Sequence, residues 1–341
     1  MVETKPAPKR GVFRVAEDAG VSIATVSRTF NEPDLVREDV RKRVIKAAAA
    51  VGYVPNSAAK ALRLQRTHIV GAVIPTLDHA IYARLVNAFQ ASLAKAGYTV
   101  VVLTVGFDNA HILPAVMQVV ERGAEALMVV GKVEDENLLN FLRIKGTPWV
   151  QTYSFTPGAA QPAIGFDNKA AISQPIDHLL ALGHERLAMI SGPLKGNDRQ
   201  LARVAAFREA LGKNGLSEDA PVIEKAYSLA DGIEAMKELH ASHPDVTAVV
   251  CSSDILAFGV LHACRQLGIR VPEDLSVTGF DDLDFAALMD PPLTTVVIGA
   301  EEMGRLAGES IAGALDEQRA LRPVCLPTTL AIRSSTGRPK A

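Results

Sequence analysis

Short amphipathic patterns divided by turn residues occupy the first 65 residues of the chain. Apolar side chains recur at helical spacing and predict four short helices, over residues 13–19, 23–30, 37–51 and 57–62. Gly20 and the Asn-Glu-Pro-Asp cluster at 31–34 interrupt the pattern, as residues that break helices do. This part of the chain is therefore predicted to form a small all-α head.

From residue 69 onward, short Val- and Ile-rich runs alternate with longer helical stretches. The runs predict strands at 69–74, 99–103, 126–130, 149–152, 187–190, 222–225, 248–251, 275–278 and 294–297. Helices are expected between them, including 80–95, 199–214 and 255–267. Such alternation is typical of parallel sheets built from repeated βα units. We expect an α/β, doubly wound domain of two lobes, with a ligand cleft at the carboxyl ends of the strands.

The composition fits an ordinary globular protein, with 48% apolar and 22% charged residues. The opening residues contain no apolar run typical of a secretory signal, and no later stretch is long and apolar enough to cross a membrane, so we expect a cytoplasmic protein. Three cysteines, Cys251, Cys264 and Cys325, have no metal-ligand spacing and suit free thiols in a reducing compartment. No metal and no cofactor is expected.

The net charge of −2 hides a division along the chain. Residues 1–66 carry thirteen Lys and Arg against seven Asp and Glu, a net charge of +6, and the remainder carries −8. Basic residues gathered in one small segment are typical of binding to a phosphate backbone, whereas DNA would repel the acidic remainder. A solvated basic helix face would give the same charge count.

Residues 19–31 form the most informative local motif. Gly20 permits a tight turn between two short helices, and Ser22 can accept a hydrogen bond in the first turn of the second helix. Val21, Val26 and Phe30 fall near one face, where they can pack on the first helix. The opposite face carries small or polar residues and one arginine that can bond a guanine edge, namely Ile23, Ala24, Thr25, Ser27 and Arg28. This arrangement is typical of a helix-turn-helix.

The chain resembles the LacI/GalR family of repressors. The resemblance begins at residues 19–31 and continues into Gly-Tyr-Val-Pro-Asn at 52–56 and Ala-Lys-Ala-Leu at 59–62. It then covers Leu-Gly-His at 182–184, Ser-Gly-Pro at 191–193, Gly-Phe-Asp-Asp at 279–282 and Pro-Pro-Leu-Thr-Thr-Val at 291–296. These motifs are specific jointly, because they occur in family order along the chain. Gly-Phe-Asp-Asn at 165–168, taken with residues 52–56, is similar to the gluconate-repressor branch.

The resemblance implies three domains: a helix-turn-helix DNA-binding domain at 1–56, a hinge helix and linker at 57–67, and a periplasmic-binding-protein-like domain at 68–341. The last would bind an effector and form a homodimer, or a tetramer built from it. A dimer also suits the head, because one helix-turn-helix reads only half of a palindromic operator.

The resemblance also implies residue roles in the head. Ile23, Ala24 and Arg28 match positions that contact bases in the major groove, and Leu62 matches a hinge leucine that family members insert into the minor groove. The remaining DNA-binding candidates are matched to phosphate, turn-capping or adjacent motif positions, and they are Ser22, Thr25, Ser27, Asn31, Tyr53, Asn56 and Lys60. Leu62 could instead be a leucine that packs in a helix.

Three residues of the head depart from the family pattern. Gly11 and Arg14 stand where the family usually has a Thr cap and an Asp, and Arg37 stands where it usually has a capping Ser. Each change is expected to weaken a helix cap worth about 0.5–2 kcal/mol while adding or keeping positive charge toward DNA.

A sugar-binding cleft needs carboxylates for paired hydroxyls, an arginine, and an aromatic face for the ring. The resemblance assigns effector anchoring to Asp281, just after the strand predicted to end near Gly279, although a cap or surface turn would also place an aspartate there. It assigns further effector contacts to Ile81, Tyr82, Tyr227 and Ser253, the last in place of the usual asparagine. Packing or capping would also account for Tyr82, Tyr227 and Ser253.

The effector-binding arginine is assigned to Arg199, beside Asn197 and Asp198 at a helix N-terminus suited to an anion. A salt-bridged surface arginine is the alternative, and Arg203 is interpreted as a structural helix residue. Tyr153 stands where many members carry a hydroxyl-binding aspartate. Losing that carboxylate while keeping the arginine favours an acidic effector, such as the sugar acid gluconate.

Other classes of protein fit less well. A transport-type solute-binding protein would carry a signal peptide and no helix-turn-helix. An enzyme is disfavoured because the sequence contains no glycine-rich phosphate fingerprint, no nucleophile elbow and no metal-spaced cluster. We therefore predict a DNA-binding transcriptional repressor of carbohydrate or sugar-acid metabolism, with a regulator of a non-sugar effector such as a purine as the alternative.

Overall fold

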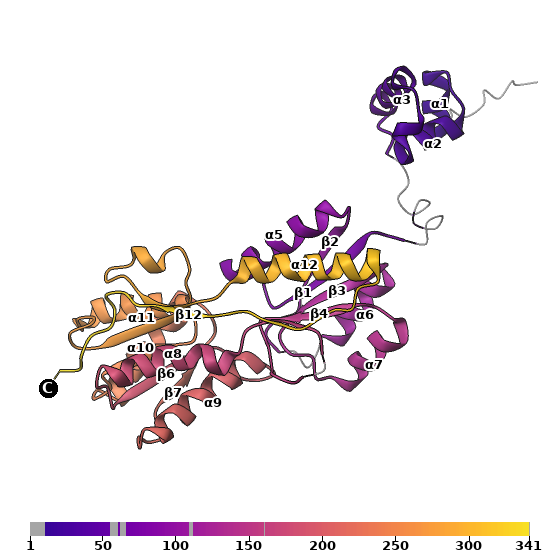
Figure 1. Ribbon diagram of the computed structural model, residues 1–341. Helices are drawn as coiled ribbons and strands as arrows, with labels where there is room; N and C mark the ends of the chain where they lie inside the picture. Colours follow the sequence, from indigo (N-terminus) through magenta and orange to yellow (C-terminus); the bar gives the residue numbers. More distant parts are fainter. Residues whose placement is uncertain (1–10, 55–60, 62–65, 109–111, 160, 341) are drawn as a thin grey trace, which may run out of the picture. The chain divides into compact units, whose positions relative to one another are not determined.

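The computed structural model describes residues 11–54, 61, 66–108, 112–159 and 161–340. Internal contacts divide the chain into two compact units, Met1–Thr67 and His68–Ala341, called here the head and the body. Figure 1 shows their elements.

Within residues 11–54, the head forms three helices around a small apolar core. They are α1 (Val12–Ala19), α2 (Ile23–Asn31) and α3 (Glu38–Ala50), with a 3₁₀ turn η1 (Pro33–Leu35) between the last two. Val15, Val26 and Val44, one from each helix, are fully buried. Gly20 ends α1 in the left-handed conformation, which glycine adopts without steric cost. The first three predicted helices are therefore confirmed, whereas nearly all of the predicted helix 57–62 lies outside the described residues.

The first lobe of the body is a six-stranded parallel sheet in the order β11-β5-β4-β3-β1-β2. Its elements are β1 (Ile69–Ile74), α5 (Ala80–Lys95), β2 (Thr99–Thr104), α6 (Leu113–Glu121), β3 (Ala124–Val130), α7 (Glu136–Lys145), β4 (Trp149–Thr152), β5 (Ala163–Gly165), α12 (Ala300–Glu317) and β11 (Val324–Cys325). Strand β3 is buried almost throughout, as a strand covered on both faces must be.

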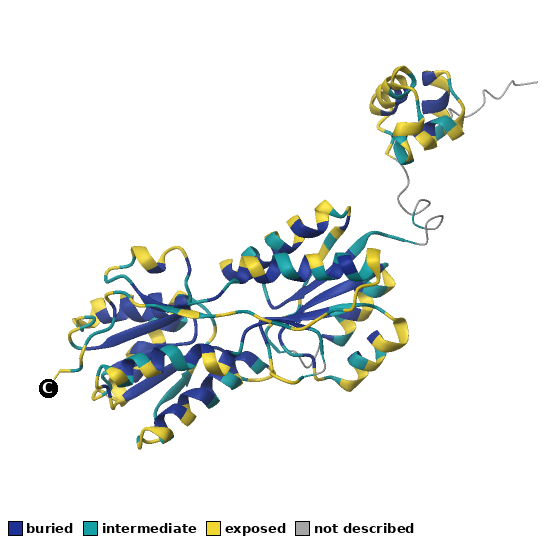
Figure 2. Cartoon of the chain, in the orientation of Figure 1, coloured by how far each residue is buried: buried dark blue, intermediate teal, exposed yellow. Residues whose placement is uncertain are grey.

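The second lobe repeats this design in the order β12-β10-β9-β8-β6-β7, with only β12 antiparallel. Its elements are α8 (Asn168–Ala181), β6 (Leu187–Ser191), α9 (Asp198–Lys213), β7 (Val222–Glu224), α10 (Leu229–Ser242), β8 (Ala248–Cys251), α11 (Asp254–Leu267), β9 (Ser276–Asp281), η3 (Ala286–Leu288), β10 (Thr294–Val297) and β12 (Thr329–Ala331). Figure 2 shows the central strands of both sheets buried beneath helices with exposed outer faces.

The two doubly wound lobes confirm the predicted fold class. The chain passes between the lobes three times, from β5 to α8, from β10 to α12 and from β11 to β12. This exchange was not predicted from the sequence. The prediction that Asp281 follows its strand was wrong, because β9 continues to Asp281. All three cysteines are free, with Cys251 and Cys264 buried and Cys325 exposed.

Helices α5 and α12 lie side by side on the first lobe, and two glycines let them approach closely (Figure 1). A Cβ atom on Gly304 would lie 2.2 Å from the carbonyl oxygen of Leu85, and one on Gly308 would lie 2.7 Å from the Cβ of Ser92. Because a backbone carbonyl cannot rotate aside as a side chain does, Gly304 is the stricter requirement.

We expect Gly304→Ala to lower the free energy of unfolding by about 1–3 kcal/mol, because the added methyl group must push the two helices apart. Gly299→Ala is the matched control, since its Cβ would meet only Glu302 at an ordinary 3.7 Å. Thermal unfolding of the full chain followed by circular dichroism would compare them. Equal melting temperatures for the two variants would contradict the packing argument.

Candidate functional site

Helix α2 of the head presents one exposed face. Ile23, Ala24, Ser27 and Arg28 are exposed on it, whereas Val26 points into the core. Ser22 begins the helix, and its hydroxyl oxygen accepts a hydrogen bond from the Thr25 amide at 3.1 Å, as the sequence predicted. Hydrogen bonding thus fixes the start of the helix, with its small and polar side chains facing outward.

The other DNA-binding candidates of the head have mixed surroundings. Thr25 is partly buried, and the Asn31 amide donates to the carbonyl oxygen of Ser27 at 2.8 Å within the same helix. The Tyr53 ring meets Phe30 edge-on at 6.0 Å between ring centroids. Asn56, Lys60 and Leu62 lie outside the described residues.

The departures from the family pattern have the expected local effect. Neither Gly11 nor Arg37 makes a side-chain cap at the helix that it precedes. Arg14 pairs with Asp18 at 3.0 Å, and Arg37 pairs with Asp39 at 3.1 Å. Much of the added positive charge is therefore balanced within the head.

The seven predicted effector-binding residues line one small cavity between the two lobes of the body. They are Ile81, Tyr82, Tyr153, Arg199, Tyr227, Ser253 and Asp281. Four further residues complete its wall: His79, Gln200, Arg203 and Ser252. Of these, only Arg203 was singled out from the sequence, and it was expected to be a structural residue. Both lobes contribute: four of the eleven lining residues belong to the first lobe, namely His79, Ile81, Tyr82 and Tyr153, and the others belong to the second.

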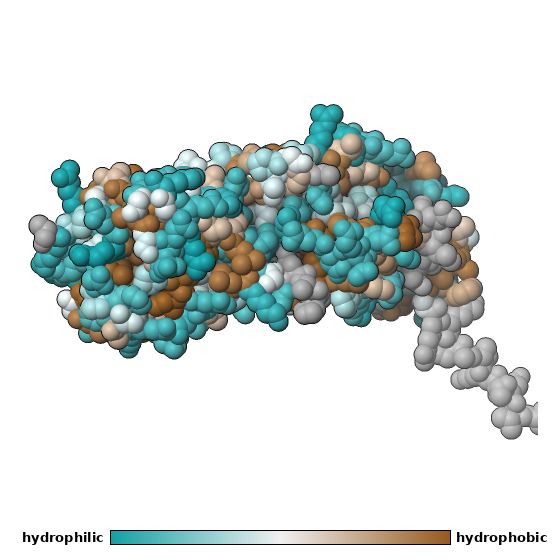
Figure 3. Space-filling view, turned by 90° about the horizontal axis from the view of Figure 1, so that it is seen from below, coloured by the Kyte–Doolittle hydropathy of each residue, from teal (hydrophilic) through white to brown (hydrophobic). Residues whose placement is uncertain are grey.

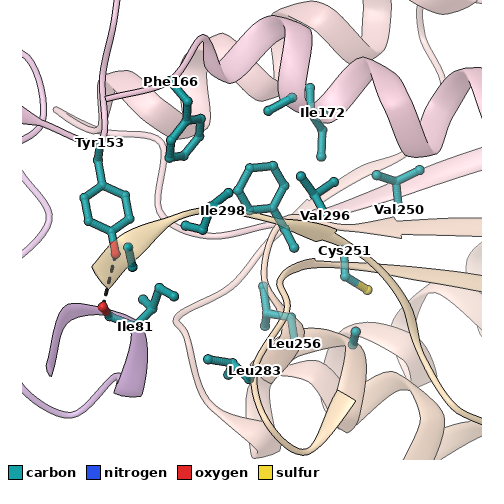
Figure 4. Packing of buried hydrophobic residues seen from close by; sticks show 14 of the residues in the cluster. Ile81, Tyr153, Phe166, Ile172, Val250, Cys251, Leu256, Leu283, Val296 and Ile298 are labelled. Atoms are coloured by element: carbon teal, nitrogen blue, oxygen red, sulfur yellow. Dashed lines mark hydrogen bonds between the residues drawn. The ribbon is translucent and has the colours of Figure 1, made fainter. Parts of the chain in front are cut away.

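Aromatic rings make up much of the cavity wall. The Tyr153 hydroxyl donates to the carbonyl oxygen of Ile81 at 3.2 Å, and Figure 4 shows this bond joining two parts of the first lobe. The Tyr227 ring belongs to the second lobe. Its centroid lies 4.7 Å from that of the Phe107 ring and 5.3 Å from that of the His79 ring, both in the first lobe. Burial raises the pKa of Tyr82, Tyr153 and Tyr227, so all three hydroxyls stay neutral.

The Tyr227 ring packs closely on Gly192 at the edge of the cavity. A Cβ atom on Gly192 would lie 2.0 Å from the Tyr227 ring, so only glycine leaves room for the ring in this position. The free volume of the cavity is about 20 Å³. An organic effector is much larger, so its binding requires the ring or the lobes to move.

Arg203 lies buried in the cavity wall. Its Nε donates to Oδ1 of Asn168 at 3.0 Å, and its Nη1 donates to the carbonyl oxygen of Ser252 at 2.8 Å. The guanidinium carbon lies 3.6 Å from the centre of the Phe280 ring, a favourable cation–π contact. Burial lowers its pKa, whereas the nearby Asp281 raises it. Arg203 thus combines the structural role expected of it with a place in the cavity wall.

Arg199 is 3% exposed, so the alternative of a surface arginine is wrong. Its Nη1 meets Oδ1 of Asp198 at 3.2 Å, and Asp198 also accepts a hydrogen bond from the Ser154 hydroxyl of the first lobe. Among the described residues, its Nη2 has no hydrogen-bond partner. Burial alone would lower its pKa, but Asp198 and three tyrosines raise it, so the side chain stays charged.

Asn197 is fully buried beside Arg199, and the sequence analysis mentioned it only as part of the loop. Neither the nitrogen nor the oxygen of its side-chain amide has a hydrogen-bond partner within the described part of the chain. It lies close enough to Tyr227 to lower the pKa of that hydroxyl, without reaching the geometry of a hydrogen bond. Unpaired buried polar groups are costly, and a ligand that supplies partners removes that cost.

Asp281 lies at the end of β9, and burial raises the pKa of its carboxyl well above the usual range, although Arg203 opposes the shift. It is neither a helix cap nor a free surface turn, so those alternatives are wrong. Ser253 is the N-cap of α11 and accepts a hydrogen bond from the Leu256 amide at 3.4 Å. The capping role weighed for Ser253 is therefore present, alongside its place in the cavity wall.

Comparison with known proteins agrees with both units. Residues 14–56 match the model of bacterial regulatory proteins of the lacI family, and residues 176–336 match a periplasmic binding protein-like domain. The HTH-type transcriptional regulator MalR of Streptomyces coelicolor is 34% identical over 304 residues, which cover 86% of each chain. The chain belongs to the lacI family of bacterial regulatory proteins.

Further lacI-family relatives agree in sequence and in fold. HTH-type transcriptional regulator GntR of Escherichia coli (strain K12) is 26% identical over 89% of this chain and 91% of its own. The lac repressor dimer, solved bound to operator and the anti-inducer ONPF, superposes with a TM-score of 0.82 at 25% identity, covering 96% of this chain and 99% of its own. This lacI-family chain is a DNA-binding transcriptional regulator.

Two kinds of feature are absent from the described residues of this lacI-family protein. No helix there is both long enough and apolar enough to cross a membrane. No group of three or more His, Cys, Asp or Glu side chains among the same residues could hold a metal ion.

We expect Arg203→Ala to destabilise this lacI-family protein by about 2–4 kcal/mol, because it leaves buried acceptors unpaired and a void beside Phe280. Arg208→Ala, at an exposed position of the same helix, is the matched control and should change stability by less than about 0.5 kcal/mol. Urea denaturation of the full chain would measure both. A shift no larger than that of the control would show that Arg203 is not a structural anchor.

Proposed function

We propose that the protein is a cytoplasmic repressor whose operator affinity is set by a small molecule bound between the two lobes. The observation that carries the proposal is the convergence of seven candidate effector residues from two lobes on one enclosed cavity. The head would read the operator through the exposed face of α2, with Ile23, Ala24 and Arg28 at base edges. No catalytic role is proposed for the cavity, since the named relatives are regulators.

The effector is proposed to be a sugar acid. Within the described residues, Arg199 offers a buried N–H group that has no hydrogen-bond partner, and the side-chain amide of Asn197 beside it also has none. A carboxylate accepts such hydrogen bonds more strongly than a neutral hydroxyl does. Because burial favours the protonated form of Asp281, that residue opposes an incoming anion less than a charged aspartate would. Asp281 would then meet the hydroxyls at the other end of the ligand.

A planar effector such as a purine is the second candidate. The rings of Tyr82 and Tyr227 line the cavity, and Phe107 packs on both of them. Such rings stack well on a flat heterocycle. The same rings also pack on the C–H face of a sugar, so the wall alone favours neither ligand. The unpaired donors at Arg199 favour the acid.

A homodimer is proposed as the working form, since one helix-turn-helix reads half of a palindrome and the similar lac repressor was solved as a dimer. The body exposes apolar side chains that a second copy could cover, among them Phe285 and Leu288, 66% and 78% exposed. Figure 3 shows apolar patches between hydrophilic side chains on one face. A shift between the lobes on binding effector would move the paired heads and so change operator affinity.

We expect Arg199→Ala to weaken gluconate binding about 10- to 100-fold, because a charge-assisted hydrogen bond is lost. The same variant should leave sorbitol, the uncharged analogue, almost unaffected. Asp281→Ala should weaken the binding of both ligands, because Asp281 is proposed to contact hydroxyl groups that both carry. Lys195→Ala, which removes an exposed charge before the same helix, is the control. Calorimetry would measure each affinity, and gluconate binding that survives Arg199→Ala would refute the acid proposal.

We expect Arg28→Ala to reduce discrimination at one operator base pair by about 1–3 kcal/mol, because a guanine contact is lost. Arg14→Ala removes a charge outside the exposed face of α2. It should weaken binding to all DNA sequences equally or not at all. Fluorescence anisotropy with a selected operator and its single-base variants would compare them. Unchanged base preference in Arg28→Ala would exclude this residue from base reading.

A further inference from the structure

Residues 281–284, which are the end of β9 and the segment after it and are called here the turn, have an unusual backbone. Asp281 has φ 116° and Asp282 has φ 51°, so two successive residues other than glycine lie in the left-handed region. Side chains with a Cβ atom rarely adopt such conformations, and they persist only where the surrounding structure imposes them. Some contact must therefore hold this turn in place.

Asp254 makes the most deeply buried of these contacts. Its side chain is fully buried at the start of α11. Oδ2 accepts a hydrogen bond from the Leu283 amide at 2.7 Å, and Oδ1 accepts one from the Thr295 hydroxyl at 2.5 Å. A Cβ atom on Gly279 would lie 2.2 Å from Oδ1, so the strand leaves just enough room for this carboxyl.

Asp254 is not needed to cap its own helix. Ser253 is the N-cap of α11 and already accepts a hydrogen bond from the Leu256 amide. Both carboxyl oxygens of Asp254 are directed instead to other segments, namely the turn and β10. Burying a carboxyl is costly and raises its pKa, here to about 7, and the hydrogen bonds from the turn and from β10 offset part of that cost.

The other contacts of the turn are more exposed to water. Arg333 donates to Asp282 at 2.7 Å, and Arg84 of the first lobe meets Asp284 at 2.6 Å. The carboxylate of Asp284 is largely exposed, and exposed ion pairs stabilise little. The Leu283 side chain is buried and lies near Leu256 in Figure 4, so the Asp254 bond fixes the turn from inside the lobe.

We propose that Asp254 is a positioning residue for effector binding, which holds the Leu283 amide so that the strained turn presents Asp281 to the cavity. This proposal rests on the proposed function, because that function assigns Asp281 to the effector. Asp254 itself does not line the cavity and would not touch the ligand.

Hydrogen exchange of the full chain, read by mass spectrometry, tests the position of the turn without any ligand. Asp254→Ala should speed exchange of the peptide spanning residues 281–288 about tenfold or more, because the Leu283 amide loses its buried acceptor. Asp254→Asn should stay close to wild type, since its oxygen can accept from Leu283 while its NH₂ group donates to the Thr295 hydroxyl. Exchange at the wild-type rate in Asp254→Ala would overturn the proposal.

Ser335→Ala is the matched control for general loss of stability. The Ser335 hydroxyl is fully buried in the same lobe, where it accepts from the Thr294 amide and donates to the Val277 carbonyl oxygen, away from the turn. It should not change exchange of residues 281–288. Equal acceleration by Ser335→Ala and Asp254→Ala would show that Asp254 acts only through overall stability.

A double-mutant cycle with gluconate tests the link to Asp281. Asp254→Ala should weaken gluconate binding about tenfold in the wild-type background and less than about twofold in the Asp281→Ala background, because both changes remove the same contact. Equal effects in the two backgrounds would overturn the link. If wild-type protein does not bind gluconate, the proposed effector class fails, whereas the exchange measurement still decides the role of Asp254.

Discussion

A guanidinium group buried in a protein must find acceptors to replace the water it has lost, and at Arg203 that requirement organises the body. Its partners come from three segments: Asn168 at the start of α8, the Ser252 carbonyl after β8, and the Phe280 ring on β9. The Asn168 amide in turn donates to the carbonyl oxygen of Tyr153 in the first lobe. One buried charge therefore fixes helix α8, two strand ends of the second lobe and, through Asn168, the cavity wall of the first.

Much of this could be predicted from the sequence, because local patterns determine it. The strands β1, β4, β8 and β10 begin and end where the apolar runs do, since each is a short buried run bounded by turn residues. The helix-turn-helix followed from Gly20 and the Ser22 cap, which act within a few residues of themselves. The seven effector candidates depended on resemblance to a family, and the fold brings them to one cavity.

What the sequence could not show depends on contacts between distant segments. Strand β5 has three residues and β11 has two, too few for any pattern, so the exchange of segments between lobes was not visible. Asn197 and Asp254 carry no local signal, because their surroundings exist only after α9, α11 and the strands have packed. From the sequence, Arg203 was predicted to be an ordinary helix residue. Its contact with the Phe280 ring, about eighty positions away in the chain, is visible only in the folded structure.

The three passages of the chain between the lobes also constrain how the protein is made. The first lobe lacks α12 and β11 until residue 325 has been synthesised, and the second lobe lacks β12 until residue 331. Neither lobe can therefore be completed until synthesis has reached residue 325, close to the end of the chain. The head, whose three described helices all lie before residue 51, has no such dependence and can fold first. A nascent chain of this protein would thus carry a finished DNA-reading unit well before it carries a finished sensor.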